Sequence, residues 1–151
     1  MSPTIADSLP ENTRREIAER SLVVGAVIRA YVSDIRNPKT KLFIVIGFDG
    51  ENVGVVYINS EIDPAALPNP YLKSLHLPVL SADNEYLDHD SYIDCRKIYE
   101  KKKEDLLKIL TENPSCHKGD ITQQDLENAN KTIKNARTIY LEIKRRYGII
   151  T

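Results

Sequence analysis

The spacing of apolar residues changes twice along the chain and divides it into three segments. In residues 1–21 apolar positions are sparse, and Ser8 stands three residues before Glu11 as in a capping box, which predicts a peripheral N-terminal helix. Residues 22–98 hold short apolar runs rich in β-branched side chains and separated by turn formers, a pattern typical of strands. Helical spacing dominates residues 99–151.

The middle segment predicts a small sheet with one clear hairpin. Two apolar runs flank Asp49-Gly50, a dipeptide that favours a tight turn between paired strands. Four prolines between 60 and 78 argue against a central strand there, because proline cannot donate a backbone hydrogen bond. Strands are predicted at 22–32, 42–48, 53–59, 76–80 and 91–95, and a short extended link at 118–121.

The last third predicts two helices. The first, at 101–110, places three leucines on one side and stops at Asn113-Pro114. Thr122 can cap the second, whose apolar stripe repeats in steps of three and four as far as Tyr147. Such a stripe packs either on the protein's own sheet or on a coiled-coil partner. Because strands come first and helices follow, the pattern predicts a single small α+β domain over 1–151.

Composition narrows the class of protein. The 151 residues are 41% hydrophobic and 28% charged, as in a globular domain. No apolar run approaches the ~20 residues of a membrane helix, and the N-terminus lacks the apolar core of a secretion signal. Two cysteines are too few for a disulfide scaffold. We therefore expect a cytoplasmic protein with reduced thiols and no membrane contact.

Charge is distributed unevenly along the chain. Residues 1–95 carry a net charge of −6 and residues 96–151 of +5. A basic C-terminal part permits contact with a nucleic acid, although exposed helices of mixed charge produce the same pattern.

Several strong catalytic motifs are absent from the sequence, among them GxxxxGK[ST], GxGxxG, HExxH and GxSxG. Cys95 and Cys116 lack the CxxC spacing of a zinc site. His76 and His89 lie in predicted loops, where each is either a general acid or base or simply solvated. Acidic residues in 85–94 either hold a metal or form a solvated loop, but their spacing is not that of an EF-hand. We expect no metal and no cofactor.

The predicted hairpin brings two polar residues to its open end. Lys41 precedes the first of its strands and Ser60 follows the second. Pairing across Asp49-Gly50 places the two side chains near each other. A cation beside a hydroxyl suits a phosphodiester, because the cation stabilises developing negative charge and the hydroxyl helps to orient it.

Five segments of the chain together resemble the MazF/PemK-type toxins of bacterial toxin–antitoxin modules. Spread over residues 24–143, they are GAVIRAYVSD, TKLFIVIGFD, NVGVVYINS, SYIDCRKI and KGDITQQDLENANKTI. The resemblance implies an SH3-like β-barrel with a C-terminal helix, here preceded by an additional N-terminal helix. It also implies a homodimer that binds an antitoxin protein and cleaves single-stranded RNA without a metal.

The family's catalytic pair is an arginine that opens the second strand and a threonine or serine that closes the third. The matching positions are Lys41 and Ser60. By this resemblance Lys41 stabilises the phosphorane and protonates the leaving oxygen, Ser60 holds a non-bridging oxygen, and His76 is a reserve candidate for the base. Arg36 and Lys39 would contact flanking phosphates. Lysine lacks the planar fork of arginine, so the alternative is a non-catalytic barrel module that binds protein or nucleic acid.

Overall fold

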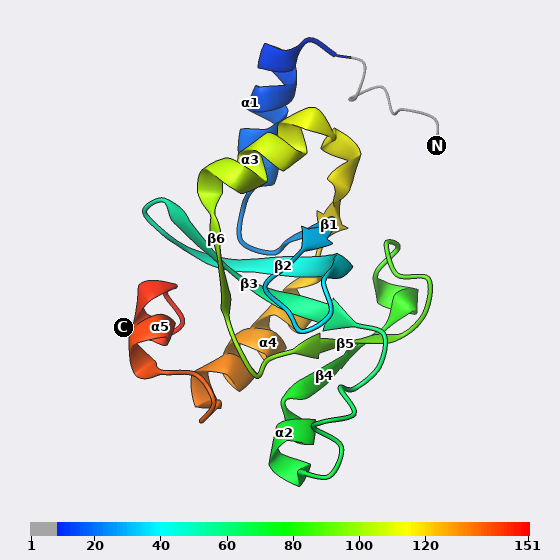
Figure 1. The fold of residues 1–151 in the computed structure, drawn as a ribbon, viewed down its shortest axis with the longest axis vertical. Coiled ribbons are helices and arrows are strands. Elements are labelled where there is room, and N and C mark those ends of the chain that lie inside the picture. Colours follow the sequence, from blue (N-terminus) through cyan, green and yellow to red (C-terminus); the bar gives the residue numbers. More distant parts are fainter. Residues whose placement is uncertain (1–8) are drawn as a thin grey trace.

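The computed structural model describes residues 9–151, so the predicted cap at Ser8 lies outside the described residues. The described chain is an α+β fold, with five α-helices, seven strands and two short 3₁₀ helices (Figure 1). The strands are β1 (Ala26–Val32), β2 (Lys39–Asp49), β3 (Asn52–Asn59), β4 (His76–Val79), β5 (Ser91–Asp94), β6 (Tyr99–Lys102) and β7 (His117–Asp120). The helices are α1 (Glu11–Ser21), α2 (Pro70–Ser74), η2 (Ser81–Asp83), α3 (Lys103–Glu112), η3 (Pro114–Cys116), α4 (Gln123–Asn135) and α5 (Leu141–Arg146).

The seven strands join one antiparallel sheet, in which six follow the order β4-β5-β3-β2-β1-β7 and β6 lies off this path. β3 pairs with β2 along one edge, and β5 and β6 share its other edge. Within the described residues the sheet is open, with β4 and β7 at its two ends, so the closed SH3-like barrel is not confirmed.

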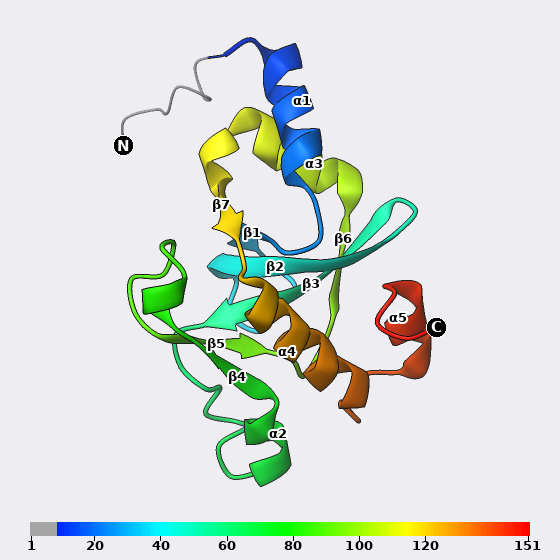
Figure 2. The same ribbon diagram turned by 180° about the vertical axis from the view of Figure 1, so that it is seen from behind.

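Helices cover both faces of this sheet (Figures 1 and 2). On one face α1 and α3 pack against alternate residues of the strands, including Phe43 and Val55. On the other face α4 and the chain around α5 pack against the intervening residues, including Ile44 and Val56. Two covered faces explain why β2 and β3 are apolar at consecutive positions rather than at every second one.

The hairpin predicted around Asp49-Gly50 is confirmed, with Gly50 at a φ of +56° in the turn. The short strands predicted near 76–80 and 91–95 are also confirmed, as β4 and β5. The first strand starts at Ala26 rather than at residue 22, because Gly25 turns the chain with a φ of +96°.

Two strands lie in the part of the chain that helical spacing dominated. β6 occupies the start of the helix predicted at 101–110, and α3 begins only at Lys103. The short link predicted at 118–121 pairs with β1 as β7. In both cases the pairing partner is distant in the sequence, so local spacing does not reveal it.

The final helix is capped as predicted but is shorter than predicted. The Thr122 hydroxyl accepts a hydrogen bond from the backbone of Asp125 at 3.1 Å. α4 ends at Asn135, and α5 follows after a five-residue break. At the break the Lys144 ammonium donates to the carbonyl oxygens of Lys134 and Ala136 at 2.9 and 2.7 Å, which satisfies groups that a continuing helix would have used.

The apolar stripe of α4 packs on the chain's own sheet, where Ala129 and Ile133 are buried with strand residues. On the opposite face Arg15 of α1 ion-pairs with Glu104 of α3 at 2.9 Å. No helix within residues 9–151 combines the length and apolar character needed to cross a membrane.

Candidate functional site

Four polar side chains lie side by side across neighbouring strands on the face that α1 and α3 partly cover. The pairing of Leu42 with Ile58 places Lys41 of β2 opposite Asn59 of β3. Asn59 in turn pairs with β5, where Asp94 lies two residues beyond the partner position and opposite His76 of β4. Directly paired residues project to the same side of a sheet, so Lys41, Asn59, Asp94 and His76 form one polar row.

Hydrogen bonds connect the polar row. The Lys41 ammonium donates to the side-chain oxygen of Asn59. The Asn59 amide nitrogen donates to Asp94 Oδ2 at 3.3 Å. His76 Nε2 lies 3.9 Å from the same Asp94 oxygen. Asn59 therefore links the cation at one end of the row to the carboxylate at the other.

Arg96 anchors the carboxylate end of the polar row. Its guanidinium contacts both oxygens of Asp94, at 3.0 and 2.8 Å, and Oδ2 of Asp63 at 3.0 Å. The hydrogen bonds that Arg96 donates to Asp94 raise the pKa of Arg96 further. Burial alone would raise the pKa of Asp94, but the hydrogen bonds and charge of Arg96 outweigh burial and lower it. The row thus holds a charged arginine between two ionised carboxylates.

Lys41 is the cation that the row holds in a half-buried position. Burial lowers the pKa of Lys41, and the nearby charge of Lys39 lowers it further. Its ammonium also lies 5.6 Å from the centre of the Tyr57 ring. A lysine with a lowered pKa gives up its proton more readily, which suits a general acid that must protonate a leaving group.

The structure places the other predicted site residues differently. Ser60 follows the last residue of β3 and is exposed, and the register puts Asn59, not Ser60, opposite Lys41. Arg36 and Lys39 are exposed at the loop and strand end that lead to Lys41. Lys39 and Lys41 are two residues apart on β2 and so project to the same side, whereas Ser60 is separated from Lys41 by one position of strand alternation.

His76 belongs to the polar row but lies beneath the surface. Its side chain is 0% exposed, and its Nδ1 is 2.9 Å from the carbonyl oxygen of Leu72. That contact makes Nδ1 the protonated nitrogen and leaves Nε2 without a hydrogen-bond partner among the described residues. In this position His76 lies buried beside Asp94 and is out of reach of a substrate at the surface.

Sequence reasoning missed Asn59 and Arg96, and it considered Asp94 only as one of the acidic residues in 85–94. The available signal was the Asp-Cys-Arg spacing in SYIDCRKI, because residues i and i+2 of a strand end project to one side. The structure adds the sheet register that aligns this pair with Lys41.

The remaining chemical candidates have structural roles in the described chain. Asp90, from the acidic 85–94 loop, accepts hydrogen bonds from the backbone and hydroxyl of Ser81 and so closes that loop. Burial raises the pKa of the Cys95 thiol to about 12, so this cysteine is a poor nucleophile. Within residues 9–151 no three His, Cys, Asp or Glu side chains gather as ligands for a metal ion.

Comparison of the chain with protein-family models and with curated protein sequences gave no match.

The polar row makes stability depend on pH in the acid range. Because the folded-state pKa of Asp94 lies below the ordinary value of about 3.9, its carboxylate stabilises the fold above that pH, and the contribution disappears as the pH falls through the folded-state pKa. Asp94→Asn is expected to lower the free energy of unfolding by about 1–3 kcal/mol at neutral pH and by less at about pH 3. Urea unfolding at both pH values measures this difference. An equal deficit at both would contradict the assignment.

Proposed function

We propose that the protein is a metal-independent endoribonuclease that cleaves single-stranded RNA, of the toxin type found in toxin–antitoxin modules. The observation that carries this proposal is the setting of the half-buried Lys41 on β2. Its ammonium is linked through Asn59 to the Asp94 carboxylate that Arg96 holds, and burial and the charge of Lys39 lower its pKa. Lys41 also occupies the position that the sequence resemblance assigns to the family's catalytic cation.

The proposed reaction is the attack of an RNA 2′-OH on its adjacent phosphate. The new 2′-O–P bond forms as the P–5′-O bond breaks, and the products are a cyclic phosphate and a free 5′-OH. Lys41 stabilises charge on the phosphorane and delivers a proton to the leaving 5′-oxygen.

We assign Asp63 as the general base that accepts the proton of the 2′-OH. Its side chain is 39% exposed. A backbone hydrogen bond from Ala65 and the hydrogen bond from Arg96 lower the pKa of Asp63 in the absence of substrate. When a phosphate replaces Asp63 as the hydrogen-bond partner of Arg96, Asp63 loses the hydrogen bond from Arg96 that lowers its pKa. Asp63 then becomes a stronger base.

One observation favours the alternative, a non-catalytic module that binds protein or nucleic acid. Each cation of the row already has a partner within the fold: Lys41 has Asn59, and Arg96 has two carboxylates. A phosphate must displace these partners before either cation can act on it.

The assay that tests the proposal uses long single-stranded RNA and the purified protein in EDTA. Cleavage that leaves 2′,3′-cyclic phosphate and 5′-OH ends supports the enzyme. Intact RNA, together with saturable binding of a protein or nucleic acid, supports the non-catalytic module.

We also propose that the protein is a cytoplasmic homodimer, neutralised by an antitoxin protein, and that its fold is an open relative of the SH3-like barrel. The open sheet leaves edges at β4 and β7 available for pairing. Light scattering at tens of micromolar is expected to give twice the chain mass of 17.1 kDa. A mass of one chain in the absence of RNA and antitoxin would contradict the dimer.

A further inference from the structure

Next to the polar row, on the same face of the sheet, lysine ammonium groups lie over a pair of tyrosine rings. The rings of Tyr57 and Tyr99 are 4.5 Å apart between centres, with their planes at 53°. Lys101 lies 5.4 Å from the Tyr57 ring, and Lys97 lies 4.7 Å from the Tyr99 ring. With Lys41, also over Tyr57, these residues form a continuous lysine–tyrosine surface.

The two tyrosines differ in what they can contact. Tyr57 is 2% exposed, and its hydroxyl donates to Asp34, so it is part of the core. Tyr99 is partly exposed: Tyr57 packs against its ring, and the ammonium of the exposed Lys97 lies over it. Lys97 is a flexible surface side chain that can move aside, so a planar ligand can take its place on Tyr99.

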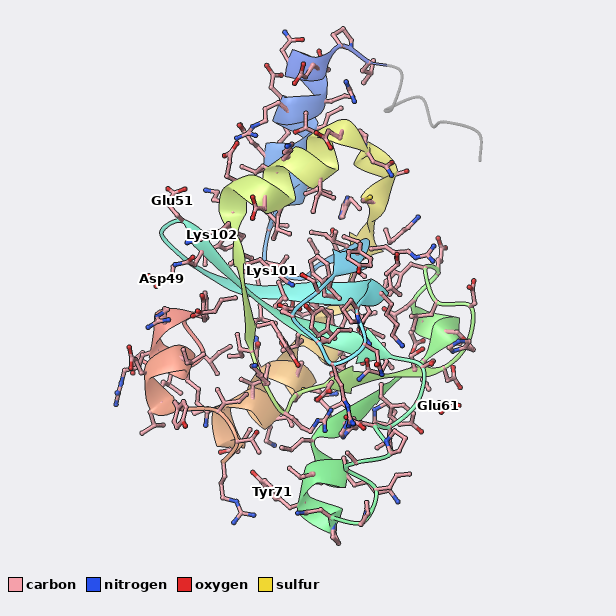
Figure 3. All side chains as sticks on the ribbon, viewed as in Figure 1. Asp49, Glu51, Glu61, Tyr71, Lys101 and Lys102 are labelled. Atoms are coloured by element: carbon pink, nitrogen blue, oxygen red, sulfur yellow. The ribbon has the colours of Figure 1, made fainter. Side chains whose placement is uncertain are left out.

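The charges beside Tyr99 suit a chain of phosphates. Lys41, Lys97 and Lys101 lie around the tyrosine pair, and the Asp34 carboxylate lies 2.7 Å from the Lys101 ammonium. Lys101 and its neighbour Lys102 lie on β6, the strand that also carries Tyr99 (Figure 3). Basic side chains beside a partly exposed aromatic ring are what proteins use to hold unpaired nucleotides.

We infer that Tyr99 is a stacking platform for one unpaired base of a single-stranded RNA, and that Lys97 and Lys101 contact the phosphates on either side of that base. This inference rests on the proposed function, because it places the RNA that Lys41 would cleave. The base stacks on the Tyr99 face that Lys97 covers in the free protein. Lys101 exchanges the Asp34 carboxylate for a phosphate.

The sequence contains no tryptophan, so Tyr99→Trp introduces a single fluorescent reporter at the platform. The ligand is a short 2′-O-methyl oligoribonucleotide, which cannot undergo the proposed attack and therefore stays intact. We expect saturable quenching of the tryptophan by this ligand and no quenching by an abasic oligonucleotide of the same length. The matched control is Tyr31→Trp, an exposed tyrosine at 67% on the opposite face, which is expected not to respond.

Two further variants separate stacking from charge. Tyr99→Leu keeps an apolar contact with Tyr57 and is expected to weaken binding of the oligonucleotide about 5- to 100-fold, measured by fluorescence anisotropy. Lys97→Ala is expected to weaken binding of the oligonucleotide. It is not expected to change the requirement for a base or the extent of quenching at saturation. Circular dichroism checks the fold of each variant.

The outcomes distinguish this inference from the proposed function. The platform would be overturned, and the ribonuclease would stand, if the protein cleaves RNA and binds the oligonucleotide but the tryptophan of Tyr99→Trp is not quenched. Quenching of the tryptophan in Tyr31→Trp instead would lead to the same conclusion. Binding and quenching without cleavage would support the platform on a non-catalytic module. Absence of both binding and cleavage would overturn both.

Discussion

Replacing Lys41 with alanine is expected to slow the cleavage of single-stranded RNA by about a hundredfold or more. The variant lacks the half-buried cation that the polar row holds beside Asn59, and with it the charge that stabilises the phosphorane. The assay measures the rate of cleavage of a long RNA in EDTA, with circular dichroism as the control for folding.

Three companion variants show whether this loss is specific. Lys41→Arg is expected to keep or raise the rate, because a guanidinium contacts two phosphate oxygens at once. Ser60→Ala is expected to cost less than Lys41→Ala, because Ser60 is exposed and offers only a neutral hydroxyl. Lys108→Ala removes an exposed lysine of α3 and is expected to leave the rate unchanged. Equal rates for Lys41→Ala and Lys108→Ala would rule out Lys41 as the catalytic cation.

The second large effect is on stability. Gly47 and Gly54 pair directly across the hairpin, and Tyr147 lies over both. A Cβ on Gly47 would lie 2.2 Å from the carbonyl oxygen of Tyr147, and one on Gly54 would lie 2.8 Å from Cγ of its ring. Each alanine substitution is therefore expected to lower the free energy of unfolding by about 3 kcal/mol, with a fall in melting temperature of about 6–12 °C.

A second substitution separates the two contacts. In a Tyr147→Ala background, Gly54→Ala is expected to cost less than about 1 kcal/mol, because the ring that it meets is gone. Gly47→Ala is expected to keep its full cost there, since the backbone oxygen of residue 147 remains. Thermal unfolding of the three single and two double variants measures the coupling. A similar coupling energy of Tyr147 with Gly47 and with Gly54 would contradict the assignment of one glycine to the backbone of residue 147 and of the other to its ring.

Local sequence patterns predicted those elements whose signals are local. The β2–β3 hairpin follows from two apolar runs around Asp49-Gly50, and the start of α4 follows from the side chain of Thr122. The end of that helix was missed because the apolar stripe continues past it, and the Lys144 ammonium satisfies carbonyl oxygens at the end of α4 only after the chain has turned back. β6 was missed because its partner β3 lies more than forty residues earlier.

The candidate site was predictable in part. Lys41 was found because it stands at the mouth of a predictable hairpin, but the hairpin alone did not decide which residue faces it. One step of register exchanges the two sides of a strand, and here the register selects Asn59 rather than Ser60. His76, which the sequence placed where a proline-rich loop meets the strand predicted at 76–80, is buried in an edge strand behind Asp94.

The sequence alone determined that this chain is an α+β domain with a central hairpin and a strand-end lysine, because apolar spacing and turn residues act over short distances. The tertiary structure decided the rest. Strand register aligned Lys41, Asn59, Asp94 and His76 in one row, and folding brought Arg96 and Asp63 to its end. Burial by distant parts of the chain then shifted the pKa of Lys41 and Asp94, together with the charges of Lys39 and Arg96, which are each two residues away in the sequence.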